Sequence, residues 1–478
     1  MTATVPLHLD LPSLRAAYAD GTLTPTAVVE AIFDAIARRG DDGVWVSLAP
    51  RAAALARARA LEALPALARA SLPLWGVPFS VKDCTDVAGV PTSSACPGFA
   101  YVPTENNPAV ERLLAAGAIF IGKTNMDQFA TGLVGVRSPH GVARNPFDAR
   151  FIPGGSSSGA AVSVAAGLVS LALATDTGGS GRVPAALNNV VGLKPTRGLV
   201  SGVGNIAACR SIETLSVFAL TVPDAQAAFE VIRGFDAHDP FARQATLAPR
   251  RLGDTFRFGV PRAAQLEFFG NGDAAALFDA AVRRLETLGG TRVEVDYGPF
   301  LEINDLLFQG PWLAERYGAL QSFVDAQPEA ILPVTRDILL GGARISGAQV
   351  FAAQRRLNLL KREIERLWLD IDVFAVPTTG TAYTIAELVA DPITLNFRLG
   401  TYTNFVNLAD LAAVAVPAGF LPNGVPQGIS LITPAFADHD AAALAERFHR
   451  HQNLPLAARA VAAADRVAPS HRQEELTT

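Results

Sequence analysis

The sequence predicts an α/β fold, in which a single large domain builds a mixed central β-sheet flanked by helices. Short apolar segments with the length of strands alternate with helical patterns along much of the chain, which favours a mixed or mainly parallel sheet. Half of the 478 residues are hydrophobic, which is enough for one large continuous core. Small side chains dominate the helix expected at 159–167, so this helix can pack tightly on a sheet.

The first 70 residues predict a helical segment that packs on the core. Apolar positions recur at helical spacing from Ser13 to Ala37, with a break near Gly21. Thr24 followed by proline is typical of a helix N-cap with proline in the first turn. A further helix is expected over 52–64, where alanine, arginine and leucine dominate.

Residues 71–466 are expected to form one continuous domain, followed by a polar tail at 467–478. Apolar runs and helical patterns alternate through it, and 235–252 reads as a loop. Strands are expected at 74–81, 118–122, 170–175, 257–260, 291–295, 373–377 and 429–432. Helices are expected at 109–116, 159–167, 274–288, 357–367 and 440–450.

Composition excludes several classes of protein. The net charge of −5 implies no basic face, so nucleic acid is not an expected partner. The three cysteines lack the spacing of a disulfide framework or a zinc site. No apolar run reaches the length of a membrane helix, and the first ten residues lack the pattern of a signal peptide. We therefore expect a cytoplasmic protein that needs neither a membrane nor a metal.

Two serines, Ser156 and Ser180, each lie in a glycine-rich turn, and a lysine, Lys82, ends an apolar segment upstream. Glycine lets a substrate approach backbone N–H groups closely, so a serine placed there is presented for chemistry. Serine attacks a carbonyl only when a base takes its proton. Burial disfavours the charged form of lysine, so Lys82 among apolar neighbours is a candidate base. The alternative is a surface lysine at the end of a strand.

A catalytic histidine is poorly supported by the sequence. His140 is the only histidine near the serine motifs, and a simple loop position explains it better. The pattern G-x-S-x-G does occur around Ser157, but no strand of the type found in α/β-hydrolases leads into it. Serine, serine and lysine together therefore indicate acyl transfer without histidine.

The segment from Lys82 to Thr196 resembles the amidase-signature hydrolases. The resemblance rests on an ordered set of motifs: V-K-D at 81–83, G-K-T-N-M-D at 122–127, G-G-S-S-S-G at 154–159, D-T-G-G-S at 176–180 and G-L-K-P-T at 192–196. It implies that Ser180 is the nucleophile, that Ser156 is a bridging serine held by a cis peptide bond, and that Lys82 is the base. It also implies a mechanism without a cofactor.

The same resemblance implies an oxyanion hole built from the backbone N–H groups of Thr177, Gly178, Gly179 and Ser180. Without the other motifs, this stretch would read as a simple β-turn. Asp176 and Arg182 are expected to support the turn by hydrogen bonds rather than to act directly. Lys123 and Lys194, which lie next to motif glycines, are interpreted as structural.

Within the family, the chain is most similar to the amidase domain of allophanate hydrolases, through strings that include T-S-S-A-C-P at 92–97 and G-P-W-L-A-E-R at 310–316. The resemblance implies that Arg316 grips the substrate carboxylate, since a guanidinium binds carboxylate through two parallel hydrogen bonds. A surface helix arginine is the alternative. Gly132 is expected to line the pocket and leave space for a flat substrate. Phe308 stands where those hydrolases carry tyrosine, which removes one hydroxyl from the substrate site.

These observations predict an amidohydrolase that releases ammonia from a small ureido compound similar to allophanate, with a homodimer expected from the family. Phe308 slightly favours a related compound such as biuret or guanylurea. Three alternatives stay open: an amidase for aliphatic or aryl amides, a glutamine-amidotransferase subunit of a tRNA-dependent complex, and a binding protein without catalysis.

Overall fold

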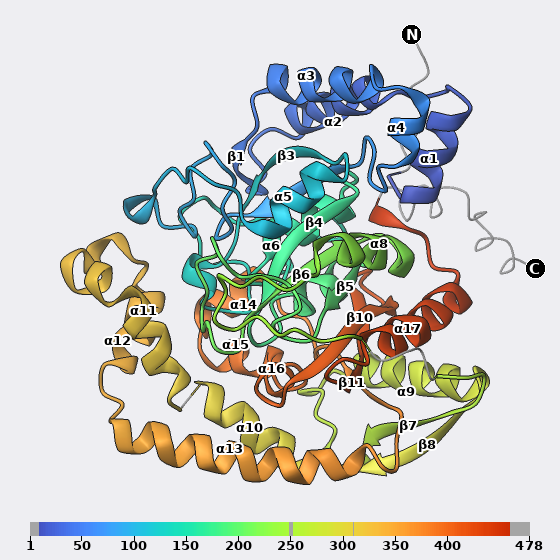
Figure 1. Ribbon diagram of the computed structural model, residues 1–478. Helices are drawn as coiled ribbons and strands as arrows, with labels where there is room; N and C mark the ends of the chain where they lie inside the picture. Colours follow the sequence, from blue (N-terminus) through green and yellow to red (C-terminus); the bar gives the residue numbers. More distant parts are fainter. Residues whose placement is uncertain (1–8, 248–251, 309, 459–478) are drawn as a thin grey trace, which may run out of the picture.

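The computed structural model describes residues 9–247, 252–308 and 310–458, which form an eleven-stranded mixed sheet with helices on both sides (Figure 1). The order of the strands across the sheet is β1-β3-β2-β4-β6-β5-β10-β11-β9-β7-β8. The strands are β1 (Trp45–Leu48), β2 (Pro78–Lys82), β3 (Ile119–Thr124), β4 (Leu171–Asp176), β5 (Val191–Lys194), β6 (Thr214–Ala219), β7 (Phe256–Pro261), β8 (Gly290–Val295), β9 (Val373–Pro377), β10 (Leu411–Phe420) and β11 (Pro426–Pro434).

The helices connect and cover these strands. They are α1 (Leu11–Ala19), α2 (Pro25–Arg39), α3 (Arg51–Glu62), α4 (Ala66–Ala70), α5 (Pro108–Ala115), α6 (Ser158–Ala165), α7 (Val183–Leu187), α8 (Val222–Ile232), α9 (Gly272–Thr287), α10 (Gly298–Phe308), α11 (Trp312–Ala326), α12 (Pro333–Gly342), α13 (Gly347–Leu367), α14 (Ile385–Ala390), α15 (Thr394–Leu399), α16 (Phe405–Leu408) and α17 (Asp438–Gln452). The α/β class predicted from the sequence is confirmed.

The sheet is mixed, and not mainly parallel. β2 pairs in parallel with β3 and β4, and β7 pairs in parallel with β8 and β9. Between these two parallel groups, β6, β5, β10 and β11 are joined by antiparallel pairs. The antiparallel centre comes from β5, β6 and β10, which the sequence analysis did not identify.

The N-terminal segment is helical, as expected, and it also supplies a strand. Thr24 caps α2, since its hydroxyl accepts a hydrogen bond from the backbone N–H of Ala27. Val28 and Ile32 of α2 lie in one buried cluster with Ile121 of β3. β1, which we did not expect from its four residues, pairs antiparallel with β3 at the edge of the sheet. The predicted polar tail at 467–478 lies outside the described residues.

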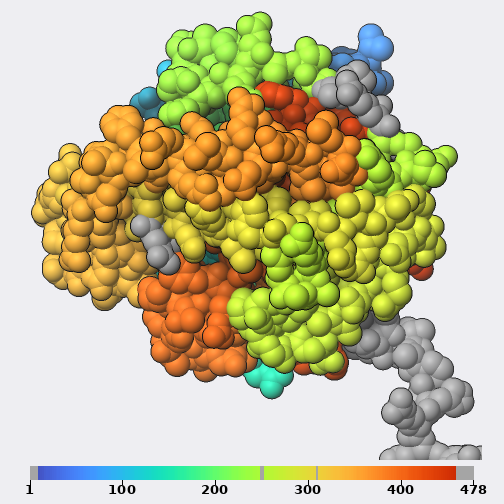
Figure 2. All heavy atoms as spheres, turned by 90° about the horizontal axis from the view of Figure 1, so that it is seen from below, coloured from blue at the N-terminus to red at the C-terminus, as the bar shows by residue number. Residues whose placement is uncertain are grey.

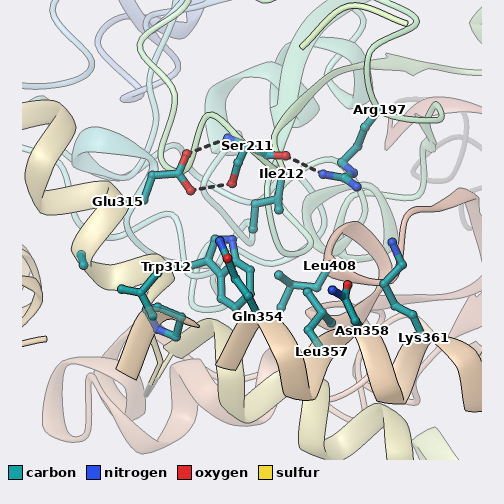
Figure 3. Close-up of a pocket in the computed structure, with 13 residues that line it drawn as sticks. Arg197, Ser211, Ile212, Trp312, Glu315, Gln354, Leu357, Asn358, Lys361 and Leu408 are labelled. Carbon is teal, nitrogen blue, oxygen red and sulfur yellow. Dashed lines mark hydrogen bonds between the residues drawn. The ribbon is translucent and has the colours of Figure 1, made fainter. Parts of the chain in front are cut away.

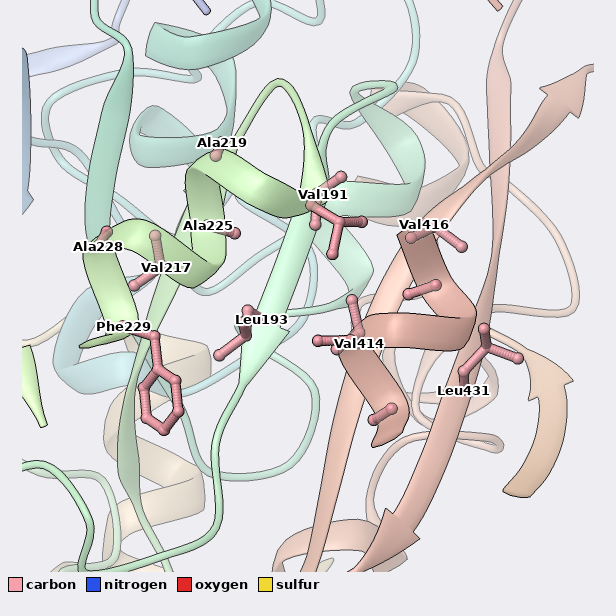
Figure 4. Packing of buried hydrophobic residues seen from close by; sticks show 14 of the residues in the cluster. Val191, Leu193, Val217, Ala219, Ala225, Ala228, Phe229, Val414, Val416 and Leu431 are labelled. Carbon is pink, nitrogen blue, oxygen red and sulfur yellow. The ribbon is translucent and has the colours of Figure 1, made fainter. Parts of the chain in front are cut away.

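A buried apolar cluster holds the middle of the sheet together (Figure 4). Val217 of β6 and Leu193 of β5 pack with Phe229 of α8, while Val414 of β10 and Leu431 of β11 extend the same cluster. This packing fixes β4, the antiparallel neighbour of β6, and therefore the turn that follows β4.

A layer of helices, α10 to α13, lies along the opposite side of the molecule from α1 to α4 (Figure 1). Its yellow and orange surface spans the face shown in Figure 2, where α13 crosses the view. α10 packs against α13, and α11 packs against α12. No helix in the described ranges is long and apolar enough to cross a membrane.

Candidate active site

The carboxyl ends of two neighbouring parallel strands bring the predicted lysine and serines together. Lys82 is the last residue of β2, and Ser180 lies in the turn that follows β4. Ser156 lies two residues before α6, in the glycine-rich segment that enters that helix. Because β2 and β4 are adjacent and parallel, the groups at their ends meet at the same edge of the sheet.

The three side chains form a continuous chain of hydrogen bonds. Lys82 Nζ lies 2.8 Å from Ser156 Oγ, and Ser156 Oγ lies 2.9 Å from Ser180 Oγ. Lys82 and Ser156 are fully buried, and Ser180 is 3% exposed. The peptide bond between Gly155 and Ser156 is cis. The geometry therefore connects a buried amine to two hydroxyls in series.

Thr175, a residue that sequence reasoning missed, is the second partner of the lysine. Lys82 Nζ donates a hydrogen bond to Thr175 Oγ1 at 2.7 Å, and Thr175 is fully buried in β4. No carboxylate pairs with Lys82 within the described part of the chain. Lys82 is thus surrounded by hydroxyl groups rather than by a fixed negative charge. A polar residue in the otherwise apolar run at 171–175 is the signal that could have indicated this role.

Asp176 organises the turn that carries Ser180. Its carboxylate accepts hydrogen bonds from the backbone N–H groups of Gly179 and Gly181, each at 2.9 Å. Burial alone would raise the pKa of Asp176, but the adjacent guanidinium of Arg182 and these hydrogen bonds hold that pKa below its usual value. The expectation that Asp176 and Arg182 support the turn agrees with these contacts.

The candidate oxyanion donors differ in their availability. The N–H of Gly179 was predicted to donate to the substrate oxyanion. In the structure this N–H donates to Asp176 Oδ1. The backbone N–H groups of Thr177, Gly178 and Ser180 have no acceptor among the described residues. Gly179 has a φ of +134°, and a Cβ there would overlap Thr403 Oγ1, so this position requires glycine.

Three contacts from outside the serine motifs lock this turn, two of them from the distant C-terminal part of the chain. Thr403 Oγ1 donates to the carbonyl of Gly178 at 2.9 Å. Asn407 Nδ2 donates to the carbonyl of Asp176 at 2.7 Å. Thr177 Oγ1 donates to Glu213 Oε2 at 2.6 Å. Thr403, Asn407 and Glu213 were not found by sequence reasoning, because no local motif connects them to the serines.

Arg316 of α11 lies in the interior, and not on the surface. It is 6% exposed, its Nη1 donates to Thr131 Oγ1 at 3.2 Å, and its Nη2 lies 3.9 Å from Cys209 Sγ. Its Nε is buried without an acceptor, and no ion pair forms to this guanidinium in the described ranges. The side chain of Phe308 lies outside the described residues.

The start of α11 is fixed to the segment before β6 (Figure 3). Glu315 accepts hydrogen bonds from the backbone N–H of Ser211 at 2.7 Å and from its hydroxyl at 2.6 Å. These bonds border a cavity of about 530 Å³ between α11, α13 and the segment around Ser211. Because Glu315 precedes Arg316 in α11, the same anchor fixes the backbone from which Arg316 projects.

Gly132, which we expected to line the pocket, lies beside two charged side chains. On the side where a Cβ would project, Gly132 faces Asp127 Oδ2 at 3.0 Å and Arg137 Nη1 at 3.1 Å. The space left by the missing side chain is therefore bordered by Arg137 and Asp127. Its φ of +145° adds a second reason for glycine.

The two motif lysines interpreted as structural are buried in separate networks. Lys123 Nζ donates to the carbonyl of Thr85 and to Thr92 Oγ1, and it pairs with Asp83 at 3.9 Å. Lys194 Nζ donates to the carbonyl of Pro195. Burial lowers the pKa of Lys194 to about 7, although Asp176 opposes that change. Neither lysine contacts Ser156 or Ser180, which agrees with the structural interpretation.

The family model for amidases matches residues 27–441, so the chain belongs to the amidase family and is an enzyme of that class.

Among curated proteins, the chain is 42% identical over 414 residues to urea amidolyase of Saccharomyces cerevisiae, across 86% of this chain and 22% of that protein. It thus spans about a fifth of that relative's length. It is 38% identical to a glutamyl-tRNA(Gln) amidotransferase subunit of Symbiobacterium thermophilum, across 77% of this chain and 80% of that protein. Among solved structures, allophanate hydrolase of Kluyveromyces lactis superposes with a TM-score of 0.85 at 40% identity, across 90% of this chain and 71% of that one.

Proposed function

We propose that this chain is an amidohydrolase that cleaves the terminal C–N bond of a small ureido compound similar to allophanate and releases ammonia. The single observation that carries the proposal is the buried hydrogen-bonded series from Lys82 through Ser156 to Ser180. The similarity of the chain to urea amidolyase and to allophanate hydrolase also supports this function.

In the proposed first step, Ser180 is the nucleophile, Ser156 the bridge and Lys82 the base. Ser180 Oγ attacks the terminal carbonyl carbon while its proton passes to Ser156 Oγ and the proton of Ser156 passes to the neutral amine of Lys82. In the structure the hydrogen bonds point from Lys82 to Ser156 and from Ser156 to Ser180. That direction is the one needed to return the proton, and rotation of the hydroxyls reverses it.

The same series completes the reaction. The tetrahedral intermediate collapses, its C–N bond breaks, and the returned proton reaches the leaving nitrogen, which departs as ammonia. Water then attacks the ester carbonyl of the acyl-enzyme and passes its proton to Ser156 and Lys82. Breaking the C–O bond to Ser180 returns that proton to Ser180 Oγ and frees the acid product.

The negative oxygen of each intermediate needs donors placed in advance. We propose the backbone N–H groups of Thr177, Gly178 and Ser180, which have no other acceptor within the described residues. Gly179 supports them through its bond to Asp176, which shapes the turn. This arrangement stabilises charge that appears only during the reaction.

Arg316 is the proposed carboxylate-binding residue. It is a buried cation without a counter-ion in the described ranges, and an anionic substrate would supply that charge. Leu307 of α10 and Leu133 approach the turn, since Cβ atoms added to Gly178 and Gly179 would meet them at 2.8 and 3.4 Å. Biuret and guanylurea, which have a similar flat shape, are the alternative substrates.

A second candidate function is that of the glutamine-hydrolysing component of a tRNA-dependent amidotransferase. The similarity to the glutamyl-tRNA(Gln) amidotransferase of Symbiobacterium thermophilum favours it. That function requires partner proteins, so turnover of a ureido compound by the isolated chain would argue against it.

Three further parts of the proposal concern organisation. Residues 71–466 are proposed as the catalytic domain, with 1–70 packed on it, and β1 is consistent with a close association. A homodimer and a cytoplasmic location stay predictions. Sedimentation of the purified chain measures the first, and fractionation of cells measures the second.

The experiment that tests the function measures ammonia released from allophanate, biuret, guanylurea, malonamate and an aryl amide, with the Ser180→Ala variant as the blank. The proposal predicts the highest kcat/KM for a ureido compound. Turnover of the aryl amide alone would contradict it.

A further inference from the structure

A second buried guanidinium lies beside Arg316. Arg137, which is 5% exposed, donates from Nη1 to the carbonyl of Thr131 at 2.9 Å. Arg316 donates to the hydroxyl of the same threonine at 3.2 Å. One residue, Thr131, thus connects two interior arginines that are 179 positions apart in the sequence.

Neither of these two guanidinium groups forms a salt bridge in the described part of the chain, although each is buried. Asp127 is the carboxylate beside Arg137, and its oxygens accept from the backbone N–H groups of Val134, Gly135 and Arg137 itself. Burial lowers the pKa of Arg137, Asp127 opposes that change, and Arg316 adds to it. The Nε atoms of both arginines are buried without an acceptor in the described part of the chain.

Arg137 also fixes the loop at 131–133, which lies between Arg316 and the turn of Ser180. Its Nη2 donates to the carbonyl of Pro392, and Leu133 N donates to Asn396 Oδ1 at 2.8 Å, so the loop is fastened to the start of α15. Leu133 approaches the position of Gly179. A single guanidinium therefore holds a loop that contacts Arg316 at one end and the serine turn at the other.

We infer that Arg137 is a positioning residue that orients Arg316 through Thr131 and adds the second positive charge that makes the site select an anionic amide over its neutral isostere. This inference rests on the proposed function. Arg137 touches no reacting atom in this scheme, because its Nη atoms are used by the carbonyls of Thr131 and Pro392.

The test compares allophanate with biuret, which carries a neutral amide in place of the carboxylate. Arg137→Met should raise KM for allophanate about 10-fold or more, and it should change kcat/KM for biuret less than about 3-fold. Thr131→Val should act in the same direction, because it removes the hydroxyl contact and keeps the carbonyl. Arg137→Lys keeps the charge but not the two contacts, so its effect should lie between those of wild type and Arg137→Met.

Arg144→Met is the matched control, since Arg144 is an exposed arginine on the following segment, and it should behave as wild type. Equal losses of kcat/KM for allophanate and biuret in Arg137→Met, or no loss for either compound, would overturn the inference. If Arg137→Met does not fold by circular dichroism, Thr131→Val decides the question with the same two substrates.

A binding measurement separates this inference from the proposed function. Calorimetry of malonamate and of neutral malonamide in the Ser180→Ala background needs no turnover. In this background, Arg137→Met should weaken malonamate binding about 10-fold and leave malonamide binding unchanged. Equal affinities of malonamate and malonamide for the protein with Arg137 intact would refute the selection of anions. A wild type that binds malonamate selectively but releases no ammonia from any ureido compound would instead refute the proposed function alone.

Discussion

Arg182 holds Asp176 through two parallel hydrogen bonds, from Nε to Oδ2 and from Nη2 to Oδ1, each 2.9 Å long. Both side chains are fully buried. The carboxylate in turn accepts the N–H groups of Gly179 and Gly181, which flank Ser180. The ion pair therefore sets the backbone of the turn that presents the proposed nucleophile.

Removing this arginine should damage stability as well as activity. Arg182→Met leaves a buried carboxylate without its cation, which costs about 3–5 kcal/mol. Chemical unfolding of the variant should show that loss. Arg150→Met is the control, because Arg150 pairs with Asp148 at the surface and should be nearly neutral. Equal stability of the two variants would contradict a structural role for the buried pair.

Ser180→Ala should abolish turnover and preserve the fold. Loss of a serine nucleophile lowers kcat by about 10⁶-fold in serine hydrolases where the catalytic groups have been removed one by one. Ser157→Ala is a matched control, since the hydroxyl of Ser157 only donates to the carbonyl of Thr175 at 3.2 Å. Ammonia release and circular dichroism measure the two effects. Activity retained by Ser180→Ala would refute the assignment of the nucleophile.

Lys82 and Thr175 should differ sharply in their effects. Lys82→Met removes the proposed base and should lower kcat about 10²–10⁴-fold. Thr175→Val removes one hydrogen bond to the lysine, worth about 1 kcal/mol, so activity should fall about 5-fold. Steady-state kinetics on the best ureido substrate compare them. A mild effect of Lys82→Met would mean that another group is the base.

Arg316→Ala should act on binding of the anion. The loss of a charged hydrogen bond, about 1.5–3 kcal/mol, should raise KM for allophanate about 10- to 150-fold. KM for biuret should change little, because biuret has no carboxylate. Parallel assays of both compounds measure the difference, and equal increases would remove the carboxylate clamp from the proposal.

His449 should make the protein sensitive to acid. Burial in α17 lowers the pKa of His449 from 6.5 to about 4. Between pH 6.5 and 4 the unfolded chain therefore binds a proton that the folded chain refuses, so stability falls as pH falls through this window. This loss of unfolding free energy is absent above pH 6.5 and is complete only below pH 4.

The size of this effect follows from about 1.4 kcal/mol for each pKa unit. From pH 7 to pH 5, wild type should lose about 2 kcal/mol of unfolding free energy more than His449→Gln, measured by denaturant titration. Parallel losses in the two proteins would mean that His449 is protonated in the folded state at pH 5.

Local sequence patterns predicted much of the fold and identified the proposed catalytic groups. The N-cap at Thr24, the strand at 373–377 and the parallel strands β2 and β4 follow from patterns of a few residues. Ser156 and Ser180 were found because glycine-rich turns mark them. β10 was missed because its alanine-rich run fits a helix as well as a strand.

The sequence by itself identified the proposed catalytic groups and their order along the chain, because turns and strand ends depend on residues that are neighbours in the chain. Only the tertiary structure decided what surrounds them. Thr403 and Asn407 reach the serine turn from more than 220 positions away, and Arg137 takes the space that Gly132 leaves open. Such contacts depend on how distant segments pack against one another, and no local pattern encodes that packing.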